Sequence, residues 1–515
     1  MLKRILITSL CVLTVFAVTL SCKHKAYLGD NIATGGSYDK GCFPDAVAEI
    51  IVKKCATAGC HNAASYTGAG NLRLDSWEQL FNGGSNGAAI IPYSTDFSPL
   101  LYFINTDTNL GTVATPTMPA AGNTPLTKSE YITIRDWVAN GAPDCNGKVP
   151  FSDNPDTRQK IYMTQQGCDL VAVIDATSKL VMRYIKVGVV DGVTESPHCL
   201  RVSPDGANAY VCFIGGRALQ RINTTSDQVD NSVTIPSLNA NPLWNILYVT
   251  PDNKNVLVCD FEATGEAVMM DAVNMSGVAK KQYTPIVNPH GVTSSESFDT
   301  LYISSQNGNT IYKTASSVVN MDVAQKISLD GNTATTNSGA VAGFPDPHEA
   351  VMLPDGSAYI VTCQGSNEVK VMDAHTNAIL KTFTAADGVG AFPQEIALSR
   401  KSHYAFISCQ DKFGTGTFKG SVFVFDYQSL AVVGTISADD GQFSQPHGLT
   451  VDDRNNVLYV ASINSDGPAP HHVTKCGGNN GYYRVFSSIP PFTALNGRRY
   501  EVTVAPYSVD IRFKN

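Results

Sequence analysis

Two cysteines and a histidine lie close together in the segment Cys55-Ala-Thr-Ala-Gly-Cys60-His61. Cysteine thiols can add to the vinyl groups of haem, and a histidine directly after the second cysteine can then bind the iron. The usual spacing leaves two residues between the cysteines, whereas four separate them here. The cluster predicts one covalent haem c, attached through Cys55 and Cys60. A disulfide or a zinc site made from the same cysteines is the alternative.

A methionine downstream could complete the iron coordination. A haem that transfers electrons commonly uses a methionine sulfur as its second axial ligand. Met118, in Thr115-Pro-Thr-Met-Pro-Ala, is the only methionine between Met1 and Met163. Because prolines restrict the backbone, this segment is suited to holding a thioether in place. We therefore expect His61 and Met118 to be the two axial ligands.

Two predicted helices must position this cluster. Pro44-Asp45 begins a pattern of helical spacing that leads to Cys55, with proline and aspartate suited to a first turn. Further on, Thr127 and Glu130 have the spacing of a capping box. Apolar residues then recur at helical spacing until Gly141, which is typical of a helix end.

This order of helix, haem cysteines, methionine segment and aromatic helix resembles the small mono-haem cytochrome c fold. It is most similar to the cytochrome-like domains appended to exported bacterial proteins, whose pattern includes Gly-Cys-His and a later Met-Pro. The resemblance covers about residues 41–147 and implies a small all-α domain. Since the terminal helices of that fold pack together, it also implies a disulfide between Cys42 and Cys145, with two free thiols as the alternative.

Length and charge limit the possible functions. A chain of 515 residues exceeds one typical hydrophobic core, which predicts at least two domains. The formal net charge of −8 argues against a nucleic-acid partner, because no basic stripe is present to neutralise phosphates. Only 16% of the residues are charged and glycine is abundant, which is typical of a β protein rich in turns.

The first residues predict export. Lys3-Arg4 precede the apolar run Ile5–Leu20, which is the pattern of a secretory signal and is too short to span a membrane. The following Ser21-Cys22 resembles the end of a bacterial lipoprotein signal, although Thr19 stands where leucine is expected. The resemblance implies a signal peptide over residues 1–22, lipidation of Cys22 and a membrane anchor. A cleaved, soluble periplasmic protein is the alternative.

The mature protein is then expected on the periplasmic side of a bacterial membrane or at the cell surface. Both places are oxidising enough for haem attachment and disulfide bonds. Residues 23–40 are polar and aperiodic, which predicts a flexible tether.

Everything after Lys148 is repetitive. The unit is a Pro-His-like start, a short apolar strand, a turn and further strands, as in Pro197–Gly206 and Pro347–Gly356. Four strands per repeat at this spacing predict a β-propeller. The repeat resembles that of the YVTN family, which is named for a Tyr-Val-Thr-Asn strand. In this chain Tyr210-Val-Cys, Tyr302-Ile-Ser and Tyr459-Val-Ala stand at the place of that strand.

The two ends of the repeat region predict how the ring closes. Residues 160–188 supply only three strands, and Pro506–Ile511 supplies the missing inner strand. Sharing one blade between both termini gives seven blades and hides the sheet edges. We therefore expect a multidomain chain: an all-α cytochrome c-like domain over residues 41–147, and an all-β seven-bladed propeller over residues 148–515, closed by the C-terminal strand.

Seven equivalent positions begin the inner strands beside the central channel. They are occupied by His198, Asn245, His290, His348, Gln394, His447 and Tyr507. Four imidazoles could bind a transition metal, most naturally copper, as blade histidines do in the nitrous oxide reductases. The ligand motifs of those enzymes are absent here. The favoured alternative is packing, in which each side chain hydrogen-bonds within the propeller.

A loop in the last blade, Asn464–Gly481, contains a second group of metal-capable residues, His471, His472 and Cys476. No fourth ligand lies at a recognised spacing, so this group is only a candidate. Cys168 and Cys199 could meet near the same face of the propeller.

Three function classes remain. The leading one is a membrane-anchored electron-transfer protein with one haem c, whose propeller docks an unidentified redox partner or substrate. The second is an oxidoreductase with copper or another cofactor in the propeller channel. The cytochrome-type nitrite reductases have a similar layout, but they have eight blades and a further haem. The third is a propeller with a structural or surface-binding role.

Overall fold

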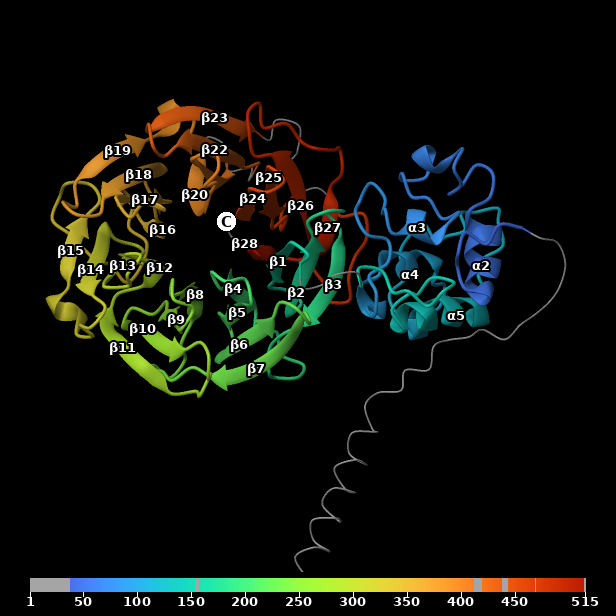
Figure 1. Cartoon of the computed structure of the whole chain (residues 1–515), viewed down its shortest axis with the longest axis horizontal. Helices are drawn as coiled ribbons and strands as arrows, with labels where there is room; N and C mark the ends of the chain where they lie inside the picture. Colours follow the sequence, from blue (N-terminus) through green and yellow to red (C-terminus); the bar gives the residue numbers. More distant parts are fainter. Residues whose placement is uncertain (1–37, 153–156, 412–418, 438–442, 468, 514–515) are drawn as a thin grey trace, which may run out of the picture.

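The structure is a computed structural model that describes residues 38–152, 157–411, 419–437, 443–467 and 469–513. A helical N-terminal domain lies beside a ring of seven four-stranded sheets (Figure 1). The seven-bladed propeller predicted from the repeats is therefore confirmed. The predicted signal peptide, Cys22 and the tether up to residue 37 lie outside the described residues. Among the described helices, none has both the length and the apolar character needed to cross a membrane.

The N-terminal domain contains short helices joined by long irregular segments. Its α-helices are α2 (Asp45–Ile50), α3 (Trp77–Leu80), α4 (Pro99–Ile104) and α5 (Lys128–Ala139). The π-helical turn η1 (Ile51–Cys55) continues α2, and single 3-10 turns occur at η2 (Tyr66–Gly68), η3 (Thr95–Phe97) and η4 (Thr108–Leu110). The expected helix leading to Cys55 is thus α-helical only as far as Ile50.

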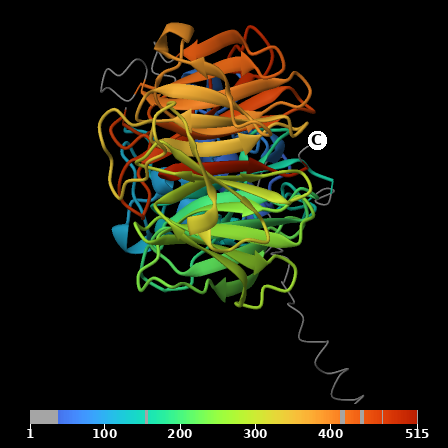
Figure 2. The same cartoon turned by 90° about the vertical axis from the view of Figure 1, so that its left-hand side faces the viewer.

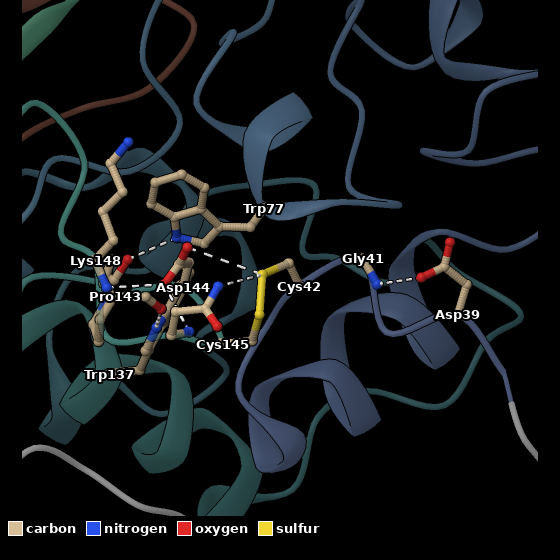
Figure 3. Close-up of a disulfide and its surroundings, with 11 residues drawn as sticks. Asp39, Gly41, Cys42, Trp77, Trp137, Pro143, Asp144, Cys145 and Lys148 are labelled. Carbon is tan, nitrogen blue, oxygen red and sulfur yellow. Dashed lines mark hydrogen bonds between the residues drawn. A yellow bond between two sulfur atoms is a disulfide. The ribbon is translucent and has the colours of Figure 1, made fainter.

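The two ends of this domain are fastened together. A disulfide with an S–S distance of 2.06 Å joins Cys42 and Cys145, the pair implied by the cytochrome c resemblance (Figure 3). Beside it, the indole nitrogen of Trp77 donates to the Ala142 carbonyl, and that of Trp137 donates to the Pro143 carbonyl, both at 2.9 Å. Because indole N–H groups removed from water need acceptors, these bonds hold both indole side chains in defined orientations.

Helix α5 packs against α2 to form the domain core. Thr127 and Glu130 make the predicted capping box at its start, and Gly141 adopts a positive φ of 92° just after its end. The buried side chains of Ile134 and Val138 face this core, together with Val47 from α2. The helix α2 that leads to Cys55 and the C-terminal helix α5 of this domain therefore share one apolar cluster.

Each blade of the propeller is an antiparallel sheet. Given from the inner to the outer strand, the sheets are β28 (Pro506–Ile511), β1 (Lys160–Gln165), β2 (Leu170–Asp175), β3 (Val181–Lys186); β4 (Pro197–Val202), β5 (Asn208–Phe213), β6 (Ala218–Asn223), β7 (Gln228–Thr234); β8 (Trp244–Val249), β9 (Asn255–Asp260), β10 (Gly265–Asp271), β11 (Ala279–Ile286); β12 (Pro289–Ser294), β13 (Thr300–Ser305), β14 (Thr310–Ala315), β15 (Gln325–Ser328); β16 (Pro347–Met352), β17 (Ala358–Cys363), β18 (Glu368–Asp373), β19 (Ile379–Phe383); β20 (Ala391–Leu398), β21 (Tyr404–Asp411), β22 (Ser421–Asp426), β23 (Ala431–Ser437); and β24 (Pro446–Asp452), β25 (Val457–Ser462), β26 (Asn480–Ser487), β27 (Tyr500–Val504). Two further 3-10 turns are η5 (Met321–Val323) and η6 (Ala385–Asp387).

One blade combines strands from opposite ends of the repeat region. In it β28 pairs with β1, with Ile511 opposite Ile161 and Val509 opposite Met163. These four side chains are buried in one apolar cluster. The inner edge of the first blade is therefore covered by the last strand of the chain.

The helical domain is attached at the rim of the propeller, beside β3 and the blade β24–β27 (Figure 1), and lies behind the propeller in Figure 2. Ile91 of this domain is buried in the same cluster as residues of β1, β2 and β25–β28. Backbone amides of Arg499 and Glu501 donate to the carbonyls of Ser85 and Asn86, at 3.2 and 3.0 Å. Apolar packing and backbone hydrogen bonds thus join the two domains.

Candidate haem site and propeller channel

The predicted haem cysteines lie where α2 and η1 end. Cys55 is the last residue of η1, and the backbone folds back so that the His61 amide donates to the Cys55 carbonyl at 3.1 Å. Both Cys55 and Cys60 are half-buried free thiols, whereas four other cysteines form disulfides. The structure therefore does not support the alternative of a Cys55–Cys60 disulfide.

His61 is held in an orientation suited to an axial ligand. Its Nδ1 atom lies 3.0 Å from the carbonyl oxygen of Leu72. Because a carbonyl oxygen can only accept a hydrogen bond, Nδ1 carries the proton and the lone pair of Nε2 is left for a metal. The Leu74 amide also donates to the His61 carbonyl at 2.8 Å. Such an outer hydrogen bond fixes both the tautomer and the direction of the ring.

Met118 lies in a segment that is tied to α4. Its amide donates to the Phe103 carbonyl at 2.6 Å, and the Ala114 amide donates to the Tyr102 carbonyl at 2.9 Å. The Met118 side chain is half-buried and packs against the same apolar cluster as Cys55. The structure thus places Cys55 and Met118 against one core, although 63 positions separate them in the sequence.

The residues present fit a covalent haem. Two free thiols, an imidazole with a free Nε2 and a thioether are the donors that haem c requires. Burial raises the pKa of the Cys55 thiol to about 12. A thioether to haem carries no charge and suits this apolar position.

The ring residues at the start of the inner strands, other than Tyr507, are buried, and most of them hydrogen-bond within the propeller, although His348 Nδ1 and His447 Nε2 have no partner among the described residues. His290 Nδ1 lies 2.8 Å from the His348 carbonyl oxygen, and His447 Nδ1 lies 3.3 Å from that of Tyr507. Gln166 Nε2 donates to His198 Nδ1 at 2.6 Å. Burial lowers the pKa of all four ring histidines, and for His290 and His447 to about 4. These imidazoles are therefore neutral at pH 7.

The geometry of the ring favours packing over metal binding. The rings of His290 and His348 lie 4.1 Å apart, and those of His447 and Tyr507 are stacked at 3.7 Å. Within the part of the chain that the structure describes, a single set of three His, Cys, Asp or Glu side chains has donor atoms all within 4.8 Å of one another, and it contains none of the ring histidines. Nor does it contain Cys55, Cys60 or His61.

A cavity of about 500 Å³ in the channel is lined by residues of all seven inner strands. At its wall Arg201 pairs with Glu349 at 2.9 Å and with Glu395 at 3.2 Å. Burial and the neighbouring Glu395 raise the pKa of Glu349. Sequence reasoning missed this trio, although Glu349 and Glu395 each directly follow a ring position and Arg201 lies three residues after one.

Two expectations about the cysteines near the ring are wrong. Cys168 forms a disulfide with Cys476, and not with Cys199, which is a buried free thiol next to the Leu247 carbonyl. Cys476 is therefore not a thiolate ligand beside His471 and His472. The set of donors within 4.8 Å is instead His471, His472 and Glu501. Sequence reasoning missed Glu501 because it lies in β27, in another part of the blade.

Comparison with known proteins identifies the N-terminal domain. Residues 58–119 match the family model described as Planctomycete cytochrome C. The matched segment contains Cys60, His61 and Met118, while Cys55 lies three residues before it. The chain therefore carries a cytochrome c domain, and this family implies covalent haem c. A search of curated proteins gives no match.

Two solved structures are similar to parts of this chain. A functionally unknown protein from Desulfotomaculum acetoxidans DSM 771 is 14% identical with a TM-score of 0.50, covering 70% of this chain and 100% of its own. Hydrazine synthase from Kuenenia stuttgartiensis is 15% identical with a TM-score of 0.41, covering 53% of this chain and 77% of its own. At 14% identity the first similarity concerns the fold alone, and no conclusion is drawn from the second.

Proposed function

We propose that the protein is an exported electron-transfer protein with one covalent haem c. The observation that carries this proposal is the hydrogen bond between His61 Nδ1 and the Leu72 carbonyl, which leaves Nε2 available in a segment whose two cysteines, Cys55 and Cys60, are free thiols. The matching cytochrome c family over residues 58–119 supports it independently.

In this proposal each residue of the site has a defined role. Cys55 and Cys60 would attach the haem, and His61 and Met118 would hold its iron. The haem would supply one-electron chemistry. Leu72 orients the imidazole, and Phe103 fixes the Met118 segment through its carbonyl. The apolar core around Cys55 and Met118 limits access of water, which is one of the factors that set a haem reduction potential.

The propeller acts as a rigid platform for an unidentified redox partner or substrate. In its first blade β28 pairs with β1, so that the inner edge of β1 is covered. A lipid on Cys22 anchors the mature protein on the periplasmic side of a bacterial membrane or at the cell surface. The net charge of −8 favours a partner with a basic face.

Expression together with a cytochrome c maturation system tests the proposal. We expect one haem that stays attached in denaturing gels, and a single haem by mass spectrometry. Cys60→Ala should abolish or greatly weaken the attachment, because one thioether is lost. Cys363→Ala, which changes a buried thiol of the propeller, is the matched control and should retain the haem. A wild-type protein without covalent haem would refute the proposal.

A second candidate function is an oxidoreductase whose substrate binds in the channel. It is favoured by Arg201 and its two buried partners, Glu349 and Glu395, on the wall of a cavity of about 500 Å³. Elemental analysis distinguishes the versions of this candidate: stoichiometric copper would support a metal in the channel, whereas iron alone would leave the haem as the redox centre.

A further inference from the structure

We propose that His471, His472 and Glu501 form a binding site for a divalent transition-metal ion at the junction of the two domains. Their donor atoms all lie within 4.8 Å of one another. The Nε2 atom of His472 and the Oε2 atom of Glu501 are 3.9 Å apart. Bonds of about 2.1 Å from one ion to each donor place the donors roughly 3–4 Å apart, so little movement is needed.

The ligand set selects a class of metal. Two imidazoles and one carboxylate suit zinc, iron(II) and cobalt(II), and disfavour calcium and magnesium, which prefer oxygen ligands alone. Three protein ligands leave coordination positions open. Because His471 is exposed while His472 is buried, those positions can face solvent on the His471 side.

A buried carboxylate oxygen without a partner points independently to a cation. The Glu501 side chain is 2% exposed. Its Oε1 atom accepts from the His471 amide at 2.6 Å and lies 3.5 Å from an Arg499 nitrogen, but Oε2 has no hydrogen-bond partner. Leaving such an oxygen unpaired is costly. A metal ion between Oε2 and the imidazoles would satisfy it.

Asn480 controls the protonation of His472. Its Nδ2 atom donates to His472 Nδ1 at 2.9 Å and to the His472 carbonyl at 2.7 Å, so the proton of the metal-free ring is on Nε2. Metal binding through Nε2 moves this proton to Nδ1. The Oδ1 atom of Asn480 is buried without a partner. If the Asn480 amide turned by 180°, its Oδ1 atom could accept a hydrogen bond from the protonated Nδ1 of His472. The bond from Asn480 Nδ2 to the His472 carbonyl would then be lost.

The surrounding structure holds the site in place. The Cys168–Cys476 disulfide connects the loop that carries both histidines to the first blade. The Phe103 ring lies 4.9 Å from the His471 ring, and the Tyr102 ring lies 5.5 Å from that of His472. The carbonyl of Phe103 also accepts a hydrogen bond from the Met118 amide. Phe103 therefore contacts both this site and the segment that carries the predicted haem ligand.

Zinc binding by the full-length protein tests the proposal. After treatment with a chelator, the protein is titrated with zinc in a calorimeter and then dialysed for elemental analysis. We expect one zinc ion per chain, and a rise in melting temperature on zinc binding. Glu501→Gln keeps the shape of the side chain but removes its charge. Loss of a residue that only hydrogen-bonds to a metal ligand weakens metal affinity by about 10- to 100-fold, so for a direct ligand we expect zinc binding to weaken at least about tenfold.

Two further variants make the result decisive. His471→Ala changes an exposed side chain, so it should fold even if Glu501→Gln does not, and it should lose the zinc-dependent rise in melting temperature. His375→Ala removes an exposed histidine of another blade and should bind zinc like the wild type. Failure of the wild type to bind stoichiometric zinc, or equal binding by His471→Ala and His375→Ala, would overturn the proposal. Haem content, measured separately by gel staining, reports on the proposed function and not on this site.

Discussion

His61 and Leu72 are joined by a hydrogen bond of 3.0 Å between the imidazole Nδ1 and the backbone carbonyl oxygen. This contact determines which nitrogen is available to iron, because the acceptor has no proton to donate. The chain from Cys60 to Leu74 is thereby folded into a compact turn, with the Leu74 amide bonded to the His61 carbonyl. The histidine is oriented by the protein backbone itself.

The methionine ligand gives the first prediction. Met118→Ala should remove the weak near-infrared band that arises from the sulfur–iron bond, while the haem stays attached through Cys55 and Cys60. Met118→His should restore a six-coordinate iron without restoring that band. Absorption spectra of the three oxidised proteins provide the measurement. If the wild type lacks the band, Met118 is not the ligand.

The sequence predicted what depends on local pattern. The repeated strand starts gave the seven blades, and the capping-box spacing of Thr127 and Glu130 gave the start of α5. The Cys168–Cys476 pair was not predictable in this way, because 308 positions separate the two cysteines and only the closed ring brings them together. Glu501 was missed for the same reason, since it reaches the histidines from a different strand.

The pairing of β28 with β1 gives the second prediction. Truncation before Ala505 removes β28, including buried Val509 and Ile511, and exposes the inner edge of β1, the strand with which β28 pairs. Exposed edges promote aggregation, so we expect a lower melting temperature and larger species in light scattering. Removal of residues 514–515 alone is the control and should change neither. A truncated protein that melts like the wild type would show that β28 is not needed to close the ring.

The ring histidines give the third prediction. Because His290 and His447 each bond to a backbone carbonyl, replacing both with glutamine should lower the free energy of unfolding, by about 1–3 kcal/mol for each lost buried partner. The haem spectrum and the metal content should stay the same, because packing residues hold no metal. If the ring were a metal site, the loss of two of its four histidines would release the metal. Chemical denaturation and elemental analysis measure both effects. Stoichiometric copper in the wild type that disappears in the double variant would show instead that the ring is a metal site.

The fourth prediction concerns pH. Burial lowers the pKa of His290 and His447 from 6.5 to about 4, against opposing effects of Glu395 and of the backbone carbonyls that they contact. The unfolded chain therefore binds more protons than the folded protein between these values. By linkage, the stability that the neutral rings contribute is fully present above pH 6.5 and is lost as the pH falls towards 4.

We expect the midpoint of denaturant unfolding to fall over this pH range in the wild type. The fall should be shallower in the His290→Gln, His447→Gln double variant, because glutamine does not titrate. His375→Ala is the matched control: its imidazole is exposed, and the pH dependence should equal that of the wild type. Equal slopes in the wild type and the double variant would mean that the two buried histidines bind protons alike in the folded and unfolded states, which contradicts the hydrogen-bonded, desolvated ring.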